Sequence, residues 1–369
     1  MTASRGPVGV GIVGAGVISD NYLTHLASYP DVEVVAIADR DLNRAESVAA
    51  AHSIAQHGDT QALLSNEDVE VVVNLTVPSV HVEVSLAALA AGKHVWSEKP
   101  IGLTRESGQV LVDRGRALGK LVGVAPDTIL GAGIQQSVRA IRDGSVGQIL
   151  SAITIVQNPG PDLWHPNPAF LFQDGAGPVL DLGPYYISAL VYAFGPVARV
   201  RAVGIKPRAR RPILSGPLAG EDFEVTKLTT ISAIIEFESG QYATSHFSFD
   251  SPLRRAGFVE VTGSEGTIAL PDPNWFGGDV RISRIGQEDD VVSTESTGLG
   301  RGLGVVNLAR AIRGGGPVIA SADLALHVLD VMLAIEEAAA SGATIDTLTS
   351  VATVPLLDPD WDPLKSTIS

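Results

Sequence analysis

Short apolar runs and amphipathic helical stretches alternate through the first third of the chain. The apolar runs cover residues 8–13, 32–38, 69–75, 93–97 and 121–124, and the helical stretches cover residues 17–28, 43–51, 80–91 and 105–118. Strands that are apolar on both faces, separated by helices of about 10–15 residues, are typical of a parallel sheet with helices on both sides. The pattern therefore predicts a doubly wound domain whose ligand site lies at the carboxyl ends of the strands.

After Pro126 the pattern changes to successive strands with few helices between them. We expect helices at 134–143 and 180–194, a Pro- and Asn-rich loop at 158–172, and strands at 149–157, 197–205, 229–237, 241–249, 257–262 and 266–270. Glu238-Ser239-Gly240 joins two of these strands as a hairpin turn. Strands in succession predict an open, mainly antiparallel sheet with helices on one face.

The chain is thus expected to be an α/β protein of two domains. Residues 1–126 form a Rossmann-type, doubly wound parallel sheet, and residues 127–369 form an α+β domain built on the mainly antiparallel sheet. A long helix with an apolar face, at residues 322–340, is expected to pack back on the first domain.

The composition of the chain limits the partners and the kinds of chemical site that we expect. The formal net charge of −15 disfavours nucleic acid and anionic membranes as partners. With no cysteine in its 369 residues, the chain has no disulfide, thiolate nucleophile or cysteine–zinc site. No metal site is expected. The segment Met1–Gly6 lacks the apolar region of a signal peptide and no apolar run reaches membrane-spanning length, so we expect a cytoplasmic protein.

The first chemical motif is a glycine turn, Gly14-Ala15-Gly16-Val17-Ile18-Ser19, between the first strand and the first helix. Gly14 permits the tight turn, and Gly16 lets a pyrophosphate approach the backbone amides at the start of the helix, near Val17 and Ile18. Ser19 stands where this motif usually has Gly or Ala, and Ser is small enough to keep the helix against the strand. Taken alone, the same residues would also suit an ordinary strand-to-helix turn.

An acidic residue follows the second strand. Asp39, which lies 25 residues after Gly14, is placed to accept hydrogen bonds from the ribose hydroxyls of adenosine and to repel a 2′-phosphate. NAD is therefore favoured over NADP, although Arg40 could stack on adenine or accommodate the phosphate. The alternative for Asp39 is a helix cap.

Glu98-Lys99-Pro100 follows the fourth strand of the sheet. At the carboxyl edge Lys99 can reach a substrate oxygen beside the nicotinamide, and Pro100 can adopt the cis form that holds a turn rigid. A surface lysine in a loop is the alternative for a Lys-Pro pair on its own.

With these motifs in place, the chain resembles the glucose–fructose oxidoreductase, inositol dehydrogenase and rhizopine-catabolism (Gfo/Idh/MocA) family over essentially its whole length. The similarity is carried by the glycine turn, Asp39, residues 76–81, Gly92-Lys93-His94-Val95 leading into Glu98-Lys99-Pro100, and residues 175–185. The resemblance implies a dinucleotide-binding domain and a second domain that supplies substrate contacts and often an oligomer interface. A homodimer or homotetramer is therefore expected.

The resemblance also implies roles for single residues. Lys99 matches the lysine that binds the reacting oxygen, Glu98 the residue near the nicotinamide ribose, and Asp181 the aspartate beside the substrate hydroxyls. Thr76, Pro78 and His81 match the loop that borders the cofactor.

The chain departs from the family pattern at two candidate substrate-binding positions. Tyr185 stands where most members carry a histidine as acid/base, although some members have tyrosine there. Because a neighbouring ammonium favours the phenolate, a pair formed by Tyr185 and Lys99 can exchange a proton with substrate; the alternative is that Tyr185 only packs its helix. Asp127 replaces the aromatic or Arg-containing stretch common after the last parallel strand, and is expected among the substrate contacts.

Aromatic residues in the long loop are candidates for substrate binding as well. The face of Trp164 suits the apolar side of a sugar ring, and His165 adds a second titratable group, but a lid or a subunit contact would also explain both.

Together these features predict an NAD(P)-dependent dehydrogenase or reductase of the EC 1.1.1 type, moving a hydride to or from a sugar, polyol or related hydroxyl or carbonyl compound. The sequence leaves two alternatives open: a redox-neutral enzyme with tightly bound cofactor, and a regulator that binds NAD without turnover.

Overall fold

The computed structural model describes residues 6–368, so the first five residues, which belong to the segment examined for a signal peptide, lie outside it. Within the described range the chain forms two compact units. The first contains residues 6–131, 296–326 and 355–368, and the second contains Ala132–Glu295 and His327–Val354. The first unit thus includes two segments that the sequence interpretation assigned to the second domain.

The first unit is built on a six-stranded parallel sheet with the strand order β3-β2-β1-β4-β5-β6. Its strands are β1 (Val8–Val13), β2 (Val32–Ala38), β3 (Gln56–Gly58), β4 (Val71–Asn74), β5 (His94–Ser97) and β6 (Val122–Val124). This is the doubly wound arrangement that the sequence predicts. The short β3 was not predicted.

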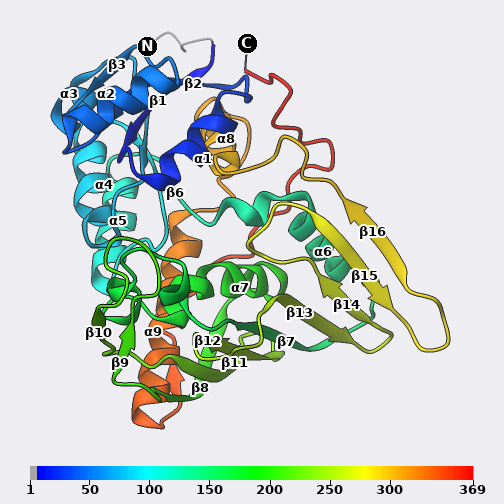
Figure 1. Ribbon diagram of the computed structural model, residues 1–369. Helices are drawn as coiled ribbons and strands as arrows, with labels where there is room; N and C mark the ends of the chain where they lie inside the picture. Colours follow the sequence, from blue (N-terminus) through cyan, green and yellow to red (C-terminus); the bar gives the residue numbers. More distant parts are fainter. Residues whose placement is uncertain (1–5, 369) are drawn as a thin grey trace. The chain divides into compact units, whose positions relative to one another are not determined.

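Helices cover both faces of this sheet. They are α1 (Val17–Leu26), α2 (Leu42–Ala51), α3 (Thr60–Ser65), α4 (His81–Ala90), α5 (Arg105–Ala117) and α8 (Leu303–Ile312). Figure 1 shows α4 and α5 on one side of the sheet and α1 and α8 on the other. The helix α8 comes from the far end of the chain and was not predicted; it adds apolar residues to the core beside β5 and β6.

The end of the chain is bound to the first unit by one buried carboxylate. Asp31 accepts hydrogen bonds from Arg310 Nε at 2.7 Å and from the backbone amides of Thr367 and Ile368 at 2.9 and 3.1 Å. Burial would raise the pKa of Asp31, but these donors outweigh it and hold the pKa below its usual value. A buried charge that is paired and hydrogen-bonded in this way fixes the segments around it.

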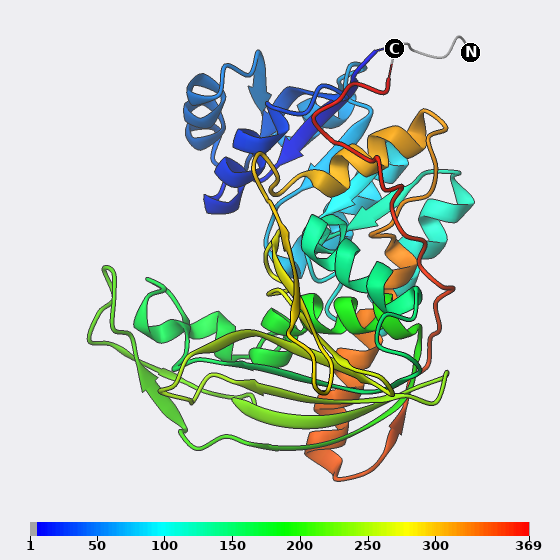
Figure 2. The same ribbon diagram turned by 90° about the vertical axis from the view of Figure 1, so that its right-hand side faces the viewer.

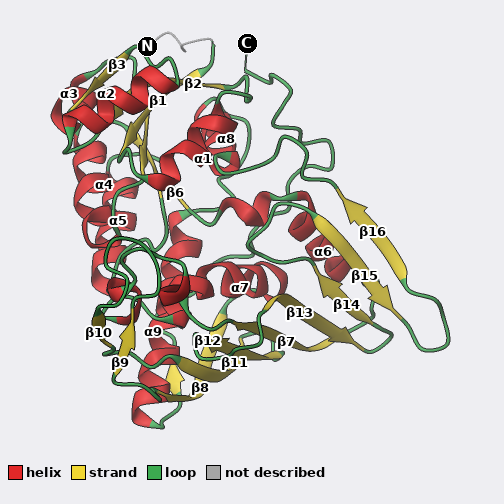
Figure 3. Ribbon diagram, in the orientation of Figure 1, coloured by secondary structure: helices red, strands yellow, loops and turns green. Residues whose placement is uncertain are grey.

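The second unit is built on a nine-stranded mixed sheet with the order β16-β15-β14-β13-β7-β12-β11-β8-β17. Its strands are β7 (Ile149–Gln157), β8 (Val197–Ile205), β11 (Thr230–Phe237), β12 (Tyr242–Ser248), β13 (Arg255–Gly263), β14 (Thr267–Leu270), β15 (Gly278–Ser283), β16 (Asp290–Thr294) and β17 (Ile345–Asp346). The pairs are antiparallel except for β7 with β12, so the prediction of a mainly antiparallel sheet is confirmed (Figure 3).

Two helices pack on one face of this sheet, α6 (Ala132–Arg142) and α7 (Pro178–Phe194) (Figure 2). Phe237 and Phe247 of the sheet meet aromatic rings of α7, so alternate residues of β11 and β12 point to α7 and the others point away. A further helix, α9 (Ala322–Ser341), begins in the first unit and continues in the second, and a small hairpin, β9 (Arg210–Pro212) with β10 (Asp222–Glu224), forms a separate two-stranded sheet.

Candidate active site

The glycine turn lies between the end of β1 and the start of α1. Gly14 has a φ of +105°, and a Cβ there would lie 2.8 Å from the backbone of Leu75, so only glycine fits. Its amide donates to the carbonyl of Ala38 at 2.8 Å. The turn is therefore closed by its neighbours in the sheet.

The start of α1 is open to a ligand. Gly16 occupies the N-cap position, no side chain caps the first turn, and nothing lies within 4 Å of the place where a Cβ of Gly16 would stand. Val17 is 96% exposed and Ile18 is half-buried. Uncapped amides at a helix N-terminus bind phosphate oxygens well, so this turn fits the pyrophosphate of a dinucleotide.

The contacts of Ser19 explain why a serine is tolerated at the third position of the motif. Its side chain is buried, and its hydroxyl donates to the carbonyl of Gly16 at 2.7 Å. The polar atom is satisfied inside the turn, so Ser19 costs little where Gly or Ala is usual.

Asp39 binds the glycine turn directly. One carboxylate oxygen accepts from the amide of Ala15 at 2.8 Å and the other from the amide of Asp41 at 2.9 Å. An ionised carboxylate has about four acceptor positions, so the capacity to bind ribose hydroxyls is retained. Arg40 is exposed beside it, and Arg44 approaches the Asp39 carboxylate to 3.9 Å.

The loop after β4 is organised by buried polar groups. Asn74 donates to the carbonyl of His81 at 2.9 Å and accepts from the hydroxyl of Thr76 at 2.6 Å. The imidazole of His81 is buried, with Nδ1 2.9 Å from the carbonyl of Pro100 and Nε2 3.0 Å from that of Thr76. His81 therefore joins the loop after β4 to the turn after β5, while Pro78 is half-buried at the start of a short 3₁₀ turn.

Glu98 and Lys99 follow β5. The Glu98 carboxylate accepts from the hydroxyl of Tyr22 at 2.8 Å and from the amide of Lys99 at 3.1 Å, and Tyr22 in turn accepts from the indole of Trp96 at 3.1 Å. Burial, and then the charge of Glu98, raise the pKa of Tyr22 well above its usual value, so Tyr22 remains a donor. The Lys99–Pro100 peptide bond is cis.

Asp127 lies in a different environment from the one that the sequence interpretation gave it. Its carboxylate is fully buried and binds Arg301 at 3.2 Å and the amide of Gly302 at 2.7 Å. Burial raises the pKa of Asp127, although the Arg301 charge opposes the shift. These contacts favour a structural role, capping α8 at Gly302, over the predicted contact with substrate.

In the second unit, Asp181 and Tyr185 lie four residues apart on α7. Residues at this spacing project from the same face of a helix. Asp181 is half-buried in the first turns of α7, and Tyr185 is buried. The following residue, Tyr186, accepts a hydrogen bond from the amide of Gly257 at 2.8 Å, which fixes the helix against β13.

Trp164 and His165 lie in the loop before α7. Trp164 is 61% exposed and its ring meets His165 edge to face at a centroid distance of 5.5 Å; His165 meets Phe170 in the same way at 5.4 Å. The Nδ1 atom of His165 accepts from the amide of Asn167 at 3.0 Å. Three rings thus form one row on the surface of the second unit.

Sequence reasoning missed the buried partners of the predicted residues. Tyr22, Trp96, Asn74 and Arg301 carry no motif, and their partners are distant in sequence; the Tyr22–Glu98 bond spans 76 positions. The one usable feature was Asn74, a polar residue that ends the run Val71-Val72-Val73.

Both halves of the chain match models of known protein families. Residues 8–125 match the model described as an oxidoreductase family with an NAD-binding Rossmann fold, and residues 134–269 match the GFO/IDH/MocA C-terminal domain. The chain belongs to the GFO/IDH/MocA family of oxidoreductases. Its first unit is an NAD-binding Rossmann domain, as the glycine turn and Asp39 predict.

The sequence identity between this chain and individual relatives is low. Trans-1,2-dihydrobenzene-1,2-diol dehydrogenase of Bos taurus is 29% identical over 72% of this chain and 74% of its own length. D-glucoside 3-dehydrogenase of Escherichia coli K12 is 30% identical over 53% of this chain and 56% of its own. The structure of levoglucosan dehydrogenase with NADH and L-sorbose matches with a TM-score of 0.82 at 22% identity, covering 93% of this chain and all of the other, which supports the fold.

Two kinds of feature are absent from residues 6–368 of this GFO/IDH/MocA protein. No group of three or more His, Cys, Asp or Glu side chains is arranged to hold a metal ion. No helix among the described residues has the length and apolar character needed to cross a membrane.

The role of Asp39 can be tested by Asp39→Asn, which keeps an acceptor for the amide of Ala15 and removes the charge. Because hydrogen bonds to a charged acceptor contribute about 1.5–3 kcal/mol, we expect the Kd for NAD to rise by roughly 10- to 100-fold. The Kd for NADP should change less, since the repulsion of the 2′-phosphate is also removed. Calorimetric titration with both nucleotides measures this ratio. The neighbouring Asp41→Asn, which alters the cap of α2 and the pairing of Asp41 with Arg44, is the control, and equal changes in the two variants would contradict the assignment.

Proposed function

We propose that this protein is an NAD-dependent dehydrogenase that acts on a CH–OH group of a sugar, polyol or related diol. The observation that carries the proposal is that one chain contains two sets of residues. The first set is the nucleotide turn and Lys99 after β5, and the second is Asp181 and Tyr185 on one face of α7. The names of the relatives, which are dehydrogenases of a diol and of a glucoside, support the substrate class.

The cofactor would be held by the residues that surround the glycine turn. The amides of Gly16, Val17 and Ile18 bind the pyrophosphate, Asp39 the adenosine ribose, and Glu98 the ribose next to the nicotinamide. Thr76, Pro78 and His81 would border it, and Arg40 would lie near the adenine. Bound NAD supplies a nicotinamide ring that takes up hydride.

The protein's own groups control the proton and the orientation of the substrate. Lys99 donates a hydrogen bond to the reacting oxygen, and Asp181 accepts one from a neighbouring hydroxyl. During oxidation the proton of the reacting hydroxyl passes to the phenolate of Tyr185 while the C–H bond is lost as hydride and a C=O bond forms. In the reverse direction Tyr185 returns the proton.

The proposal is tested by following NAD reduction with a panel of sugars, inositols and diols. We expect turnover with at least one of them, and a fall in kcat of roughly 10²- to 10⁴-fold in Lys99→Met with little change in the Kd for NAD. Lys365→Met, which alters an exposed lysine paired with Asp362, is the control. Wild-type protein that binds NAD and reduces none of it with any member of the panel would instead indicate a regulator without turnover.

The role of Tyr185 is tested by Tyr185→Phe. The variant lacks the hydroxyl that exchanges the proton, so its kcat should be lower than that of the wild type by roughly 10²-fold or more, with little change in the Kd for NAD. Tyr186→Phe is the matched control, because burial raises the pKa of Tyr186 and its hydroxyl already accepts from Gly257. An unchanged kcat in Tyr185→Phe would remove this residue from the mechanism.

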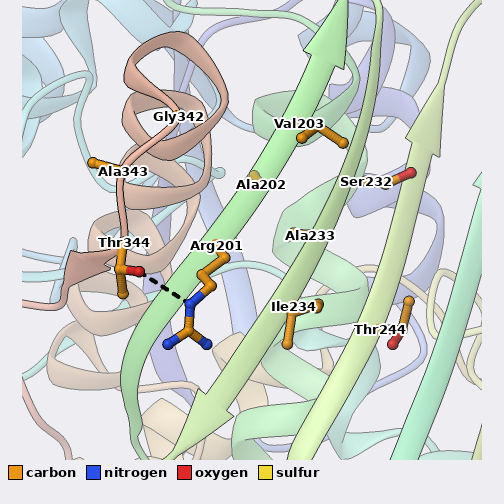
Figure 4. Close-up of a pocket in the computed structure, with 10 residues that line it drawn as sticks. All are labelled: Arg201, Ala202, Val203, Ser232, Ala233, Ile234, Thr244, Gly342, Ala343 and Thr344. Atoms are coloured by element: carbon orange, nitrogen blue, oxygen red, sulfur yellow. Dashed lines mark hydrogen bonds between the residues drawn. The ribbon is translucent and has the colours of Figure 1, made fainter.

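We also propose that the protein forms a homodimer or homotetramer through the face of the nine-stranded sheet opposite α7. Figure 4 shows Arg201, Val203, Ile234 and Thr244 projecting from β8, β11 and β12 on this face, beside a pocket at the end of α9. Val203 is 71% exposed, and Ile153, Ile205, Ile234 and Tyr242 are also exposed. Large apolar residues in such a cluster are typical of an interface.

The charges on the face also suit a second copy. Arg199 and Arg201 both pair with Glu236 on the neighbouring strand, so each sheet carries charges of both signs. A two-fold interface brings the same patch together from both copies, which requires this kind of self-complementarity.

A charge placed in the patch should separate the copies. We expect Val203→Glu to give a monomer by light scattering at concentrations where the wild type is a dimer or larger, because an unpaired carboxylate would be buried in the interface. Ile285→Glu, at a fully exposed position in the turn after β15, should leave the mass unchanged. A monomeric wild type, or equal masses for Val203→Glu and the wild type, would contradict the proposal.

A further inference from the structure

Arg211 in β9 is buried, although its neighbours Arg210 and Pro212 are exposed. Its side chain is 2% exposed. The guanidinium contacts Asp162 at two points: Nε donates a hydrogen bond to Oδ2 at 3.1 Å, and Nη2 lies 3.1 Å from Oδ1 as a charge contact without hydrogen-bond geometry. A guanidinium can make both contacts at once, and a lysine ammonium cannot.

Arg211 also contacts the same loop through the carbonyl of Pro159, to which Nη2 donates at 2.5 Å, and it has further contacts in the second unit. Nη1 donates to the carbonyl of Phe249 at 2.9 Å and to Asp250 at 3.2 Å, and the guanidinium lies 4.8 Å from the centre of the Phe172 ring. Asp250 also accepts from the hydroxyl of Thr229 at 2.6 Å. A buried ion pair with this many partners has one well-defined geometry.

The backbone of the loop before α7 passes close to this ion pair. Gly160 has a φ of +107°, and a Cβ there would lie 2.3 Å from Asp162 Oδ1 and 2.7 Å from Arg211 Nη2. The glycine is therefore required by the position of the guanidinium. Residues 158–172 are in this way fitted around Arg211.

The ion pair also connects the loop to the β9–β10 hairpin. The amide of Leu214 donates to the carbonyl of Asp162 at 3.0 Å. On the hairpin, Gly216 lies so close to Pro166 that a Cβ on it would be 2.5 Å from the proline ring. Two segments that would otherwise be independent surface loops thus form one body.

The loop carries the aromatic row Trp164, His165 and Phe170 and leads directly into α7. The amide of Gly177, the N-cap of α7, donates to the carbonyl of Leu171 at 3.0 Å. Leu182 of α7 packs against the cluster formed by Phe172 and Phe249. The row of rings is therefore held in a fixed position relative to the helix that bears Asp181 and Tyr185.

We infer that Arg211 is a positioning residue for substrate, whose buried pair with Asp162 holds the row of Trp164, His165 and Phe170 as a rigid apolar surface that binds one face of a sugar ring. The inference rests on the proposed function for the identity of the ligand. Arg211 itself does not touch substrate; its effect passes through the loop, so it should alter substrate binding more than the chemical step.

The test is Arg211→Lys, which keeps the charge and loses the two-point pairing. We expect the KM for the sugar to rise by roughly two- to tenfold, the range that corresponds to one lost aromatic contact, with kcat changed by less than a factor of about two. The Kd for NAD should not change. Arg210→Lys, one position away with an exposed side chain that donates to the carbonyl of Asp222 at 3.1 Å, should behave as the wild type.

A double-mutant cycle separates positioning from a general loss of stability. Trp164→Ala should raise the KM by a similar factor, and the double variant Arg211→Lys/Trp164→Ala should be no worse than Trp164→Ala alone, since Arg211 acts through the ring. Multiplicative effects, or an unchanged KM in Arg211→Lys, would overturn the inference. If Arg211→Lys does not fold, Asp162→Asn, which weakens the pair from its other side, is subjected to the same criteria.

A readout that does not need activity keeps this inference distinct from the proposed function. Amide hydrogen exchange across residues 158–172 should be faster in Arg211→Lys than in Arg210→Lys and the wild type. Equal exchange in all three proteins overturns the positioning role. Absence of turnover with every sugar overturns the proposed function, and with it the assignment of the aromatic row to a sugar.

Discussion

The site depends on the parallel pairing of β1, β2, β4 and β5, which brings four strand ends to one edge of the sheet. The pairing continues past the strands themselves. The amide of Gly14 donates to Ala38, that of Leu75 to Val13, and that of Glu98 to Asn74. Asp39, Thr76 and Lys99 each follow within two residues of a strand that ends there. A dinucleotide site assembled from distant segments is a consequence of this edge.

Buried polar groups fix the conformation of the loops at that edge of the sheet. His81 lies between the carbonyls of Thr76 and Pro100, and Tyr22 links α1 to Glu98. A polar group taken out of water without a partner is costly, so each of these side chains restricts the backbone to the conformations that satisfy it. Arg211 does the same in the second unit for the loop before α7. Both units therefore use buried hydrogen bonds to hold the segments that are proposed to meet ligands.

The long apolar strands and the helices between them could be predicted from sequence because their period reflects burial directly. β1, β2, β7 and β8 end at the predicted residues. The strand β3 and the hairpin β9–β10 have three residues per strand, too few to show a period. The helix α8 was missed although its apolar residues recur at helical spacing. The contribution of the late segments to the first unit depends on contacts such as Asp31 with Arg310, 279 positions apart, which no local pattern contains.

The site residues also divide into those that a motif identifies and those whose environment depends on partners distant in sequence. The place of the glycine turn, Asp39 and Glu98-Lys99-Pro100 at the ends of strands could be predicted because a motif fixes it. Asp127 was assigned to substrate from its position alone, and its burial against Arg301 depends on a partner 174 positions away. The burial of Arg211 could not be predicted, because the local sequence carries no information on a buried carboxylate 49 positions distant.

The most direct measurement is a crystal structure of the protein with NAD and a turned-over sugar. The account predicts that the reacting oxygen lies within hydrogen-bond distance of both Lys99 Nζ and Tyr185 Oη, with the pyrophosphate on the amides of Gly16 and Val17. A nicotinamide ring far from Lys99, or a sugar bound without contact to either side chain, would contradict it.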